Sequence, residues 1–201
     1  MATAAPPPPR TLLIACGALA REVLALVALN GWSHLELTCL PAKLHNRPER
    51  IPAAVRRKIR AGRRTHERIL VLYGDCGTGG LLDAVLAEEG VERIPGPHCY
   101  AFFRGIDAFL AEADAEPGCF YLTDYLVRHF DRLVIEGLGL DRHPELLPLY
   151  FGNYTRLVYL AQTPDAGLER KAKAAALRLG LAFEQRTTGY GGLDDFLRRA
   201  S

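Results

Sequence analysis

The sequence predicts an α/β protein with a Rossmann-like, mainly parallel sheet and helices on both faces, and the same pattern is compatible with two similar α/β halves. Two observations carry this prediction. Short apolar runs alternate along the chain with segments of helical periodicity, which is the pattern of repeated βαβ units. The chain has 201 residues, of which 49% are hydrophobic and 24% charged, and these values are typical of a globular domain.

The strands are predicted from short apolar runs that end at glycine, proline or polar residues. They cover residues 11–15, 35–40, 69–73, 91–94, 119–122, 156–160 and 181–186. The run at 69–73 is the clearest, because a glycine-rich loop follows it at once. Strands that are separated by helices favour parallel pairing, since a parallel connection needs a crossover segment.

The helices are predicted between these strands. They cover residues 18–29, 51–59, 81–89, 100–112, 168–179 and 193–199, with one more after the fifth strand. In the second helix, Ile51, Val55 and Ile59 recur at the spacing of one helix face, and Pro52 suits a first turn. Gly180 ends the last long helix, because glycine readily adopts the left-handed conformation of a helix C-cap.

We expect one domain from 11 to 201, preceded by a disordered, proline-rich tail at 1–10. Four consecutive prolines favour an extended tail. No change in composition divides the rest of the chain, and the stretch 137–154 is the best candidate for an internal boundary between two α/β halves. A chain of this length buries about 70% of its unfolded surface, so it needs no disulfides to stay folded.

The sequence favours a cytoplasmic protein that does not enter a membrane. No apolar run approaches the length of about 18 residues that crosses a bilayer. The N-terminus has neither the positive start nor the apolar core of a secretory signal. The five cysteines are then expected to be reduced, as thiols usually are in the cytoplasm.

Positive charge is concentrated between residues 43 and 68, where ten lysines and arginines accompany two glutamates. The rest of the chain is mildly acidic. The segment could bind phosphates, but no aromatic residues are interleaved with it and no nucleic-acid-binding motif accompanies it. A solvated face, or a docking surface for an acidic partner, is therefore favoured over a nucleic-acid site.

Thiols and imidazoles gather where the predicted strands end, which is the edge at which open α/β sheets bind ligands. Cys16, Cys76 and Cys99 follow the first, third and fourth strands, each in a glycine-rich or polar turn where an apolar thiol has no packing role. His45 follows the second strand, and His98 precedes the last of these cysteines. Three thiolates and either histidine would complete a tetrahedral shell for zinc or another thiolate-binding metal.

No Cys-x-x-Cys or His-x-x-x-His spacing supports this site, so the fold must assemble it. Cys39 and Cys119 are interpreted instead as small apolar residues of their strands. Thiol chemistry without a metal is the alternative, because Cys16 and Cys76 each precede a predicted helix whose positive end lowers a thiol pKa. The candidate catalytic residues are Cys76, Asp75 and Glu22.

The glycine-rich loop after the third strand is a candidate cofactor-binding segment through Gly74, Gly77, Thr78 and Gly79. A turn between a strand and a helix exposes backbone N–H groups that can bind an anion. The loop matches neither GxGxxG nor the phosphate-binding loop GxxxxGK, so no nucleotide motif is present. Asp75 would also repel a phosphate unless it were paired, and a tight turn that needs positive φ accounts for the glycines equally well.

Five short motifs occur in order along the chain. They are Cys16-Gly17-x-Leu19-x-x-Glu22, Leu44-His45, Tyr73-Gly74-Asp75-Cys76-Gly77-Thr78-Gly79, His98-Cys99-Tyr100 and Leu122-Thr123-Asp124. Together they resemble an uncharacterised domain-of-unknown-function family, number sixteen-thirty-eight, over residues 11–196. Genes of that family often neighbour corrinoid-dependent methyltransferases and the proteins that reactivate their cobalamin, and in some bacteria genes of methionine synthesis. The resemblance transfers no reaction and no catalytic residue.

The resemblance implies a setting in corrinoid-dependent methyl transfer, with methionine synthesis as one instance. Together with the predicted thiolate site, it leads us to expect an accessory metal-binding protein that supports this transfer. A bound metal would keep a thiol deprotonated and nucleophilic near neutral pH. The implied partner is a corrinoid protein or a methyltransferase. Two alternatives stay open: a metal-free enzyme with Cys76 as nucleophile and a nearby histidine as base, and a non-catalytic module that docks an acidic partner through Arg56–Arg64.

Overall fold

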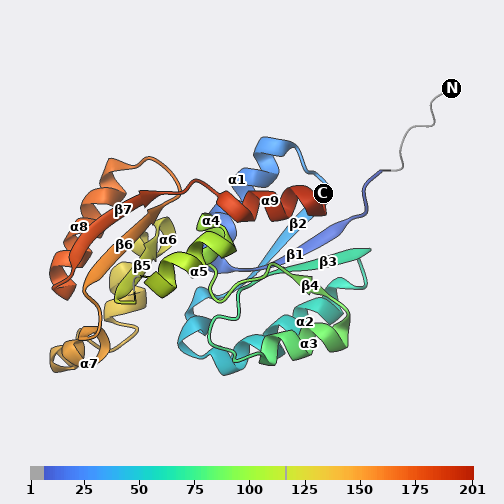
Figure 1. Ribbon diagram of the computed structural model, residues 1–201. Helices are drawn as coiled ribbons and strands as arrows, with labels where there is room; N and C mark the ends of the chain where they lie inside the picture. The colour runs from blue at the N-terminus through green and yellow to red at the C-terminus, as the bar shows by residue number, and fades with distance from the viewer. Residues whose placement is uncertain (1–6, 116) are drawn as a thin grey trace. The chain divides into compact units, whose positions relative to one another are not determined.

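The computed structural model describes residues 7–115 and 117–201. The chain forms two compact units. The first consists of the residues up to Cys99 together with Asp194–Ser201, and the second consists of Tyr100–Leu193. Each unit has one sheet whose strands are all parallel, so the predicted Rossmann-like α/β class is confirmed (Figure 1). The first six residues of the predicted tail lie outside the described residues, and the stretch 137–154 lies inside the second unit.

The first sheet has the strand order β2-β1-β3-β4. Its strands are β1 Thr11–Cys16, β2 Leu35–Leu40, β3 Arg68–Leu72 and β4 Glu92–Arg93. Every residue of the central strand β1 is buried, as expected for an apolar run inside a parallel sheet. Cys16 aligns with Leu40 of β2, and Ala15 aligns with Leu72 of β3. The carboxyl ends of these three strands therefore meet at one edge of the sheet.

Helices cover both faces of this sheet. α1 (Ala20–Asn30) lies on one face, and α2 (Ile51–Gly62) and α3 (Leu81–Glu89) lie on the other (Figure 1). The predicted apolar stripe of α2 is confirmed, since Ile51, Val55 and Ile59 are fully buried. Short 3-10 turns precede α1 and α2, at Gly17–Leu19, Ala42–Asn46 and Pro48–Arg50.

The C-terminal end of the chain belongs to the first unit. α9 spans Gly191–Ala200, and near its end the guanidinium carbon of Arg198 lies 5.8 Å from the centre of the Trp32 ring. Arg68 of β3 donates a hydrogen bond of 2.7 Å to the carbonyl oxygen of Ala200. The last turns of α9 therefore lie on the face that carries α1 (Figure 1).

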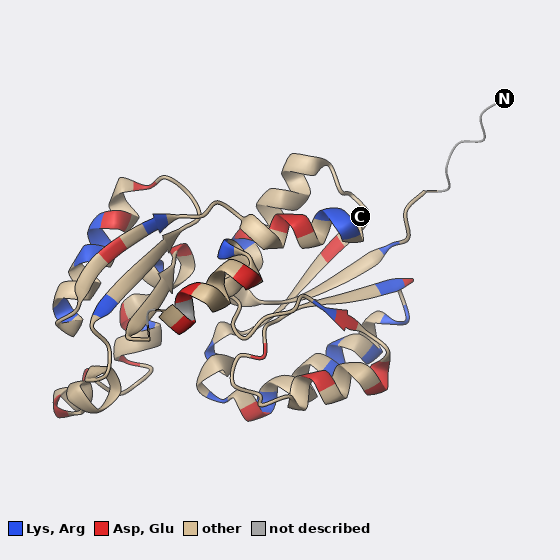
Figure 2. Cartoon of the chain, viewed as in Figure 1, with Lys and Arg blue, Asp and Glu red and all other residues tan. Residues whose placement is uncertain are grey.

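Ion pairs between α2 and α3 neutralise part of the basic segment. Glu89 Oε1 lies 2.9 Å from Arg60 Nε, the same carboxylate lies 3.7 Å from Arg63, and Arg56 pairs with Glu88. The Glu89 side chain is only 7% exposed, so its charge needs these partners. Positive and negative residues accordingly lie side by side along the two helices in Figure 2. The face predicted to dock an acidic partner is less positive than its sequence indicates.

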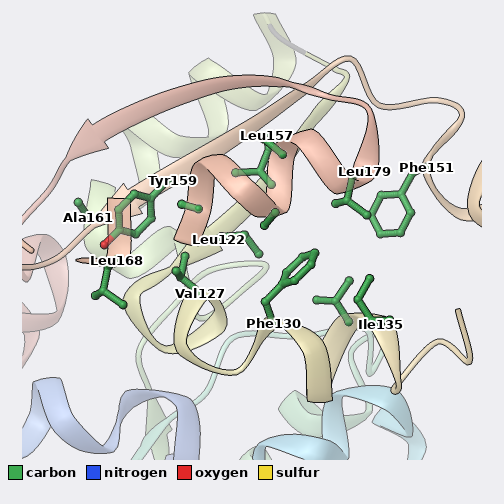
Figure 3. Close-up of a cluster of buried hydrophobic side chains, with 14 of the residues drawn as sticks. Leu122, Val127, Phe130, Ile135, Phe151, Leu157, Tyr159, Ala161, Leu168 and Leu179 are labelled. Carbon is green, nitrogen blue, oxygen red and sulfur yellow. The ribbon is translucent and has the colours of Figure 1, made fainter. Parts of the chain in front are cut away.

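The second sheet has the strand order β5-β6-β7. Its strands are β5 Cys119–Thr123, β6 Arg156–Ala161 and β7 Ala182–Thr187. The helices of this unit are α4 Ala101–Arg104, α5 Ile106–Ala115, α6 Asp124–Arg128, α7 Leu147–Phe151 and α8 Ala166–Leu179, with a π-helix at Asp131–Ile135 and a 3-10 turn at Pro144–Leu146. Its larger core includes Leu122, Leu157 and Leu168 (Figure 3). A smaller cluster on the other side of the sheet contains Phe109 and Val158.

Two segments of the second unit depart from the predicted pattern. The helix predicted at 100–112 is two helices, because Gly105 between them has a φ of 82°, which ends a right-handed helix. The π-helix and the 3-10 turn between α6 and α7 follow neither of the periodicities from which elements are predicted. No helix within the described residues combines the length and the apolar character needed to cross a bilayer.

Candidate metal centre

The candidate site lies at the carboxyl edge of the first sheet. In the strand order β2-β1-β3-β4, the connection from β1 leads to its neighbour β2, and the connection from β3 leads to its neighbour β4 on the opposite side. The two connections therefore lead away from each other at the boundary between β1 and β3. Such a switch point is where open α/β sheets bind ligands. Cys16 ends β1, Cys76 lies in the loop after β3, and Cys99 lies beyond β4. His45 lies in the turn after β2.

The structure brings one histidine and two cysteines from three separate segments together. The ligand atoms of His45, Cys76 and Cys99 all lie within 4.8 Å of one another. The two sulfur atoms in this group, Cys76 Sγ and Cys99 Sγ, are 3.3 Å apart. Cys16 adjoins the group, because its Sγ lies 3.8 Å from His45 Nδ1. The three cysteines are buried and His45 is exposed; we call these four residues the thiol cluster.

Two backbone hydrogen bonds join the loops that carry Cys76 and Cys99. The N–H of Asp75 donates to the carbonyl oxygen of Gly96 at 2.9 Å, and the N–H of Cys76 donates to that of Pro97 at 2.7 Å. Both donors lie at or next to Cys76, and the two acceptors lie three and two residues before Cys99. These bonds hold the backbone of the loop that carries Cys76 against that of the loop that carries Cys99.

Gly74 allows the same two loops to touch. A Cβ atom at this position would lie 2.8–2.9 Å from three backbone atoms of His98, which is closer than packed atoms approach. The loop also holds Cys76 at a φ of 51°, in the left-handed region that residues other than glycine rarely adopt. Strained backbone of this kind is concentrated at functional sites.

The Asp75 carboxylate closes the glycine-rich loop on itself. It accepts hydrogen bonds from the N–H of Gly80 at 2.9 Å, the hydroxyl of Thr78 at 2.7 Å and the N–H of Gly79 at 3.1 Å. These bonds lower the pKa of Asp75. Thr78 and Gly79, which the sequence offers as donors to a cofactor anion, thus bind the Asp75 carboxylate instead. Gly77 occupies a turn position with a φ of 84°.

Arg93 links the exits of β3 and β4. Its Nη1 donates to the carbonyl oxygens of Ile94 at 3.0 Å, Gly96 at 3.3 Å and Tyr73 at 3.5 Å. Its Nε and Nη2 bind the carboxylate of Asp83 at 2.6 and 2.9 Å, so the guanidinium cannot turn away. Because the three carbonyl groups belong to both cysteine-bearing connections, one side chain positions both.

Hydrogen bonds within the thiol cluster shift the pKa values of its members in opposite directions. Hydrogen bonds with Cys99 lower the pKa of Cys76 to about 4 and that of Cys16 to about 5, although burial opposes both shifts. The same contacts raise the pKa of Cys99 well above its usual value. Partial desolvation beside the buried thiols lowers the pKa of His45, but hydrogen bonds to Cys16 and Cys76 outweigh it and raise the pKa to about 11. The lowered pKa values of Cys76 and Cys16 favour the thiolate, which is the form in which cysteine binds metals.

Tyr73 belongs to the site, and the sequence did not reveal it. Its side chain is fully buried. Its ring lies nearly parallel to that of His45, with the centroids 6.4 Å apart. Burial, together with the nearby Cys16 and Cys99, raises the pKa of Tyr73, so the phenol keeps its proton. Its sequence signals were its place at the end of an apolar run, directly before Gly74, and its position as the first residue of the third family motif.

The remaining predicted residues lie outside the thiol cluster. His98 is half-buried and is not part of the group whose ligand atoms converge; burial lowers its pKa. Glu22 is buried in the first turn of α1. Cys39 is half-buried in β2, and Cys119 is half-buried in β5 of the second sheet.

A family model described as "Protein of unknown function (DUF1638)" matches residues 39–197. The matched part contains His45, Cys76 and Cys99 and begins after Cys16. No curated protein and no solved structure matches the chain. The comparisons therefore confirm the family resemblance noted in the sequence and supply no activity.

Proposed function

The chain belongs to the DUF1638 family, and we propose that it is a metal-binding protein whose ion is held by Cys76, Cys99 and His45. The observation that carries this proposal is the convergence of their ligand atoms within 4.8 Å from three segments far apart in the sequence. Sulfur and imidazole ligands favour zinc, or another metal that prefers thiolates, over magnesium and calcium.

The distances within the cluster support a tetrahedral ion. Two thiolates that each bind zinc at about 2.3 Å lie about 3.8 Å apart. Cys76 Sγ and Cys99 Sγ, now 3.3 Å apart, would need to separate by only about 0.5 Å to reach that geometry. We propose Cys16 as the fourth ligand in the resting protein; its sulfur already accepts a hydrogen bond from the N–H of Ala18 at 3.4 Å, the kind of contact that orients a thiolate ligand.

We propose further that this ion serves corrinoid-dependent methyl transfer, the setting that the family resemblance implies, with methionine synthesis as one instance. An incoming substrate thiol would replace Cys16 and lose its proton on binding. The methyl group would pass from the cobalt of a methylated corrinoid to the thiolate sulfur, leaving the cobalt two electrons richer. The partner would be a corrinoid protein or a methyltransferase, in the reducing cytoplasm where these thiols stay reduced.

Cobalt(II) titration tests the metal proposal, because thiolate ligands give cobalt intense charge-transfer absorption. We expect the wild-type protein to bind one cobalt per chain and zinc to displace it. Cys76→Ser and Cys99→Ser should abolish the tetrahedral spectrum, while Cys39→Ser, outside the cluster, should leave it unchanged. Binding that survives both cluster substitutions would contradict the proposed site.

Methylcobalamin with 2-mercaptoethanol tests the methyl-transfer role separately. The zinc-loaded protein should accelerate the loss of the methylcobalamin spectrum, and Cys76→Ser should not. A zinc-loaded protein without any accelerating effect, with or without a corrinoid protein present, would contradict that role while leaving metal binding intact.

The contact between Cys16 Sγ and His45 Nδ1 favours one second candidate, a metal-free enzyme that uses a cysteine nucleophile beside a histidine. Such an enzyme should have one cysteine that iodoacetamide modifies much faster than the others at neutral pH, with the same rate before and after addition of zinc. Protection of that cysteine by zinc would favour the metal site instead.

A further inference from the structure

We infer that Cys76 and Cys99 form a reversible disulfide that empties the metal site, so that metal binding by this protein responds to disulfide oxidants. The release of metal rests on the proposed function, whereas the disulfide rests on geometry alone. The two Sγ atoms are 3.3 Å apart, and a disulfide bond is about 2.05 Å long. The sulfurs therefore need to approach by only about 1.2 Å.

The folded backbone favours closure of this bond. The hydrogen bonds from Asp75 to Gly96 and from Cys76 to Pro97 hold the two cysteine-bearing loops side by side. The loss of chain freedom that opposes closure of a disulfide loop has therefore already occurred during folding. What remains is the approach of two sulfur atoms that already lie in a buried contact.

The Cys76–Cys99 bond forms by thiol–disulfide exchange with a small disulfide, RSSR. The thiolate of Cys76 attacks one sulfur of RSSR, which forms a mixed disulfide and releases RS⁻. Cys99 then gives up its proton to the released RS⁻ in the metal-free protein, or its bond to zinc in the loaded protein, and its sulfur attacks the Cys76 sulfur. This closes the intramolecular disulfide and releases the second RS⁻. Any remaining RS⁻ takes a proton from water, the two protein sulfurs lose two electrons in total, and RSSR gains them.

The disulfide removes two of the proposed ligands at once. Disulfide sulfurs carry no negative charge and bind zinc weakly, since the thiolate is the ligand form. Only His45 and Cys16 would remain of the thiol cluster, too few for a tetrahedral protein site. The zinc ion should therefore leave as the bond forms, and reduction should restore the site.

The experiment treats zinc-loaded wild-type protein with 2-hydroxyethyl disulfide, a small neutral oxidant, and follows three readouts. Zinc release is measured with a chromogenic chelator, the intact mass should fall by about 2 Da for one disulfide, and peptide mapping identifies the pair. We expect one Cys76–Cys99 bond per zinc released, and dithiothreitol should reverse both changes. Cys39→Ser should behave like the wild type, and Cys76→Ser should lose the bond.

The outcomes separate this inference from the proposed function. A folded protein that binds zinc but forms only mixed disulfides, or pairs Cys16 with either cysteine, overturns the inference and leaves the metal proposal standing. A protein that binds no zinc yet forms the Cys76–Cys99 bond overturns the metal proposal and supports the disulfide. The same mapping on metal-free wild-type protein keeps the test valid if a serine variant fails to fold.

Discussion

Replacing Gly74 with alanine tests whether the contact between the two cysteine-bearing loops sets the metal affinity of the proposed site. The new Cβ would lie 2.8 Å from the carbonyl carbon of His98 and 2.9 Å from its Cα and N, whereas ordinary packing contacts lie at 3.4–4 Å. These are backbone atoms, so no side-chain rotation relieves the clash. One loop must therefore retreat by roughly 0.5 Å, and Cys99, the next residue, must move with His98.

We expect this movement to weaken zinc binding about 10- to 100-fold, the usual effect of disturbing the groups that orient metal ligands. The metal-free protein should lose about 1–3 kcal/mol of unfolding free energy through overpacking. Zinc affinity is measured by competition with a chromogenic chelator, and stability by urea unfolding.

Gly62→Ala is the matched control for this experiment. A Cβ at Gly62, at the end of α2, would collide with the side chain of Leu12 near the start of β1, at the opposite end of the sheet from the thiol cluster. This variant should lose stability and keep wild-type zinc affinity. The reasoning is refuted if Gly74→Ala binds zinc as tightly as the wild type.

Three further substitutions test other parts of the structure. Cys16→Ser should keep one cobalt per chain but lose about a third of the charge-transfer intensity, because one of three thiolates is gone; an unchanged spectrum would exclude Cys16 as a ligand. The Arg93 guanidinium lowers the pKa of Asp83. This ion pair therefore stabilises the folded protein fully at pH values above the unfolded Asp pKa of about 3.9. The stabilisation is lost as the pH falls through the lowered pKa of Asp83 in the folded protein. Urea unfolding of metal-free protein should therefore show a steeper loss of stability on acidification in the wild type than in Arg93→Met, and parallel curves would contradict this. Glu89→Gln should cost about 1–3 kcal/mol of unfolding free energy, because Arg60 and its neighbours on α2 lose a buried carboxylate; unchanged stability would show that these ion pairs contribute nothing.

Most of the fold could be predicted because its elements obey simple periodicities. The continuous apolar run of β1 and the apolar stripe of α2 both follow from the burial that a parallel sheet imposes. The break at Gly105 could not be predicted, because an isolated glycine within a helical pattern is often tolerated. The π-helix Asp131–Ile135 has no sequence signature of its own, although its residues Val134 and Ile135 pack into the larger core of the second unit.

The convergence of the thiols could be predicted in outline and not in detail. Cys16, Cys76 and Cys99 each follow a strand, and parallel strands present their carboxyl ends at a single edge. Which histidine joins them depends on the path of a loop, and the sequence alone left His45 and His98 equivalent. The self-contained turn at Asp75 was accessible in principle, because an aspartate followed by a threonine and glycines is typical of a side chain that caps its own loop.

The metal content of freshly purified protein tests the central claim most directly. Protein expressed without added metal and purified under reducing, anaerobic conditions should contain about one thiophilic metal ion per folded chain by elemental analysis. The Cys76→Ser/Cys99→Ser double variant, prepared in parallel, should contain almost none. A folded wild-type protein that holds no metal, and takes up no zinc after full reduction, would contradict the account.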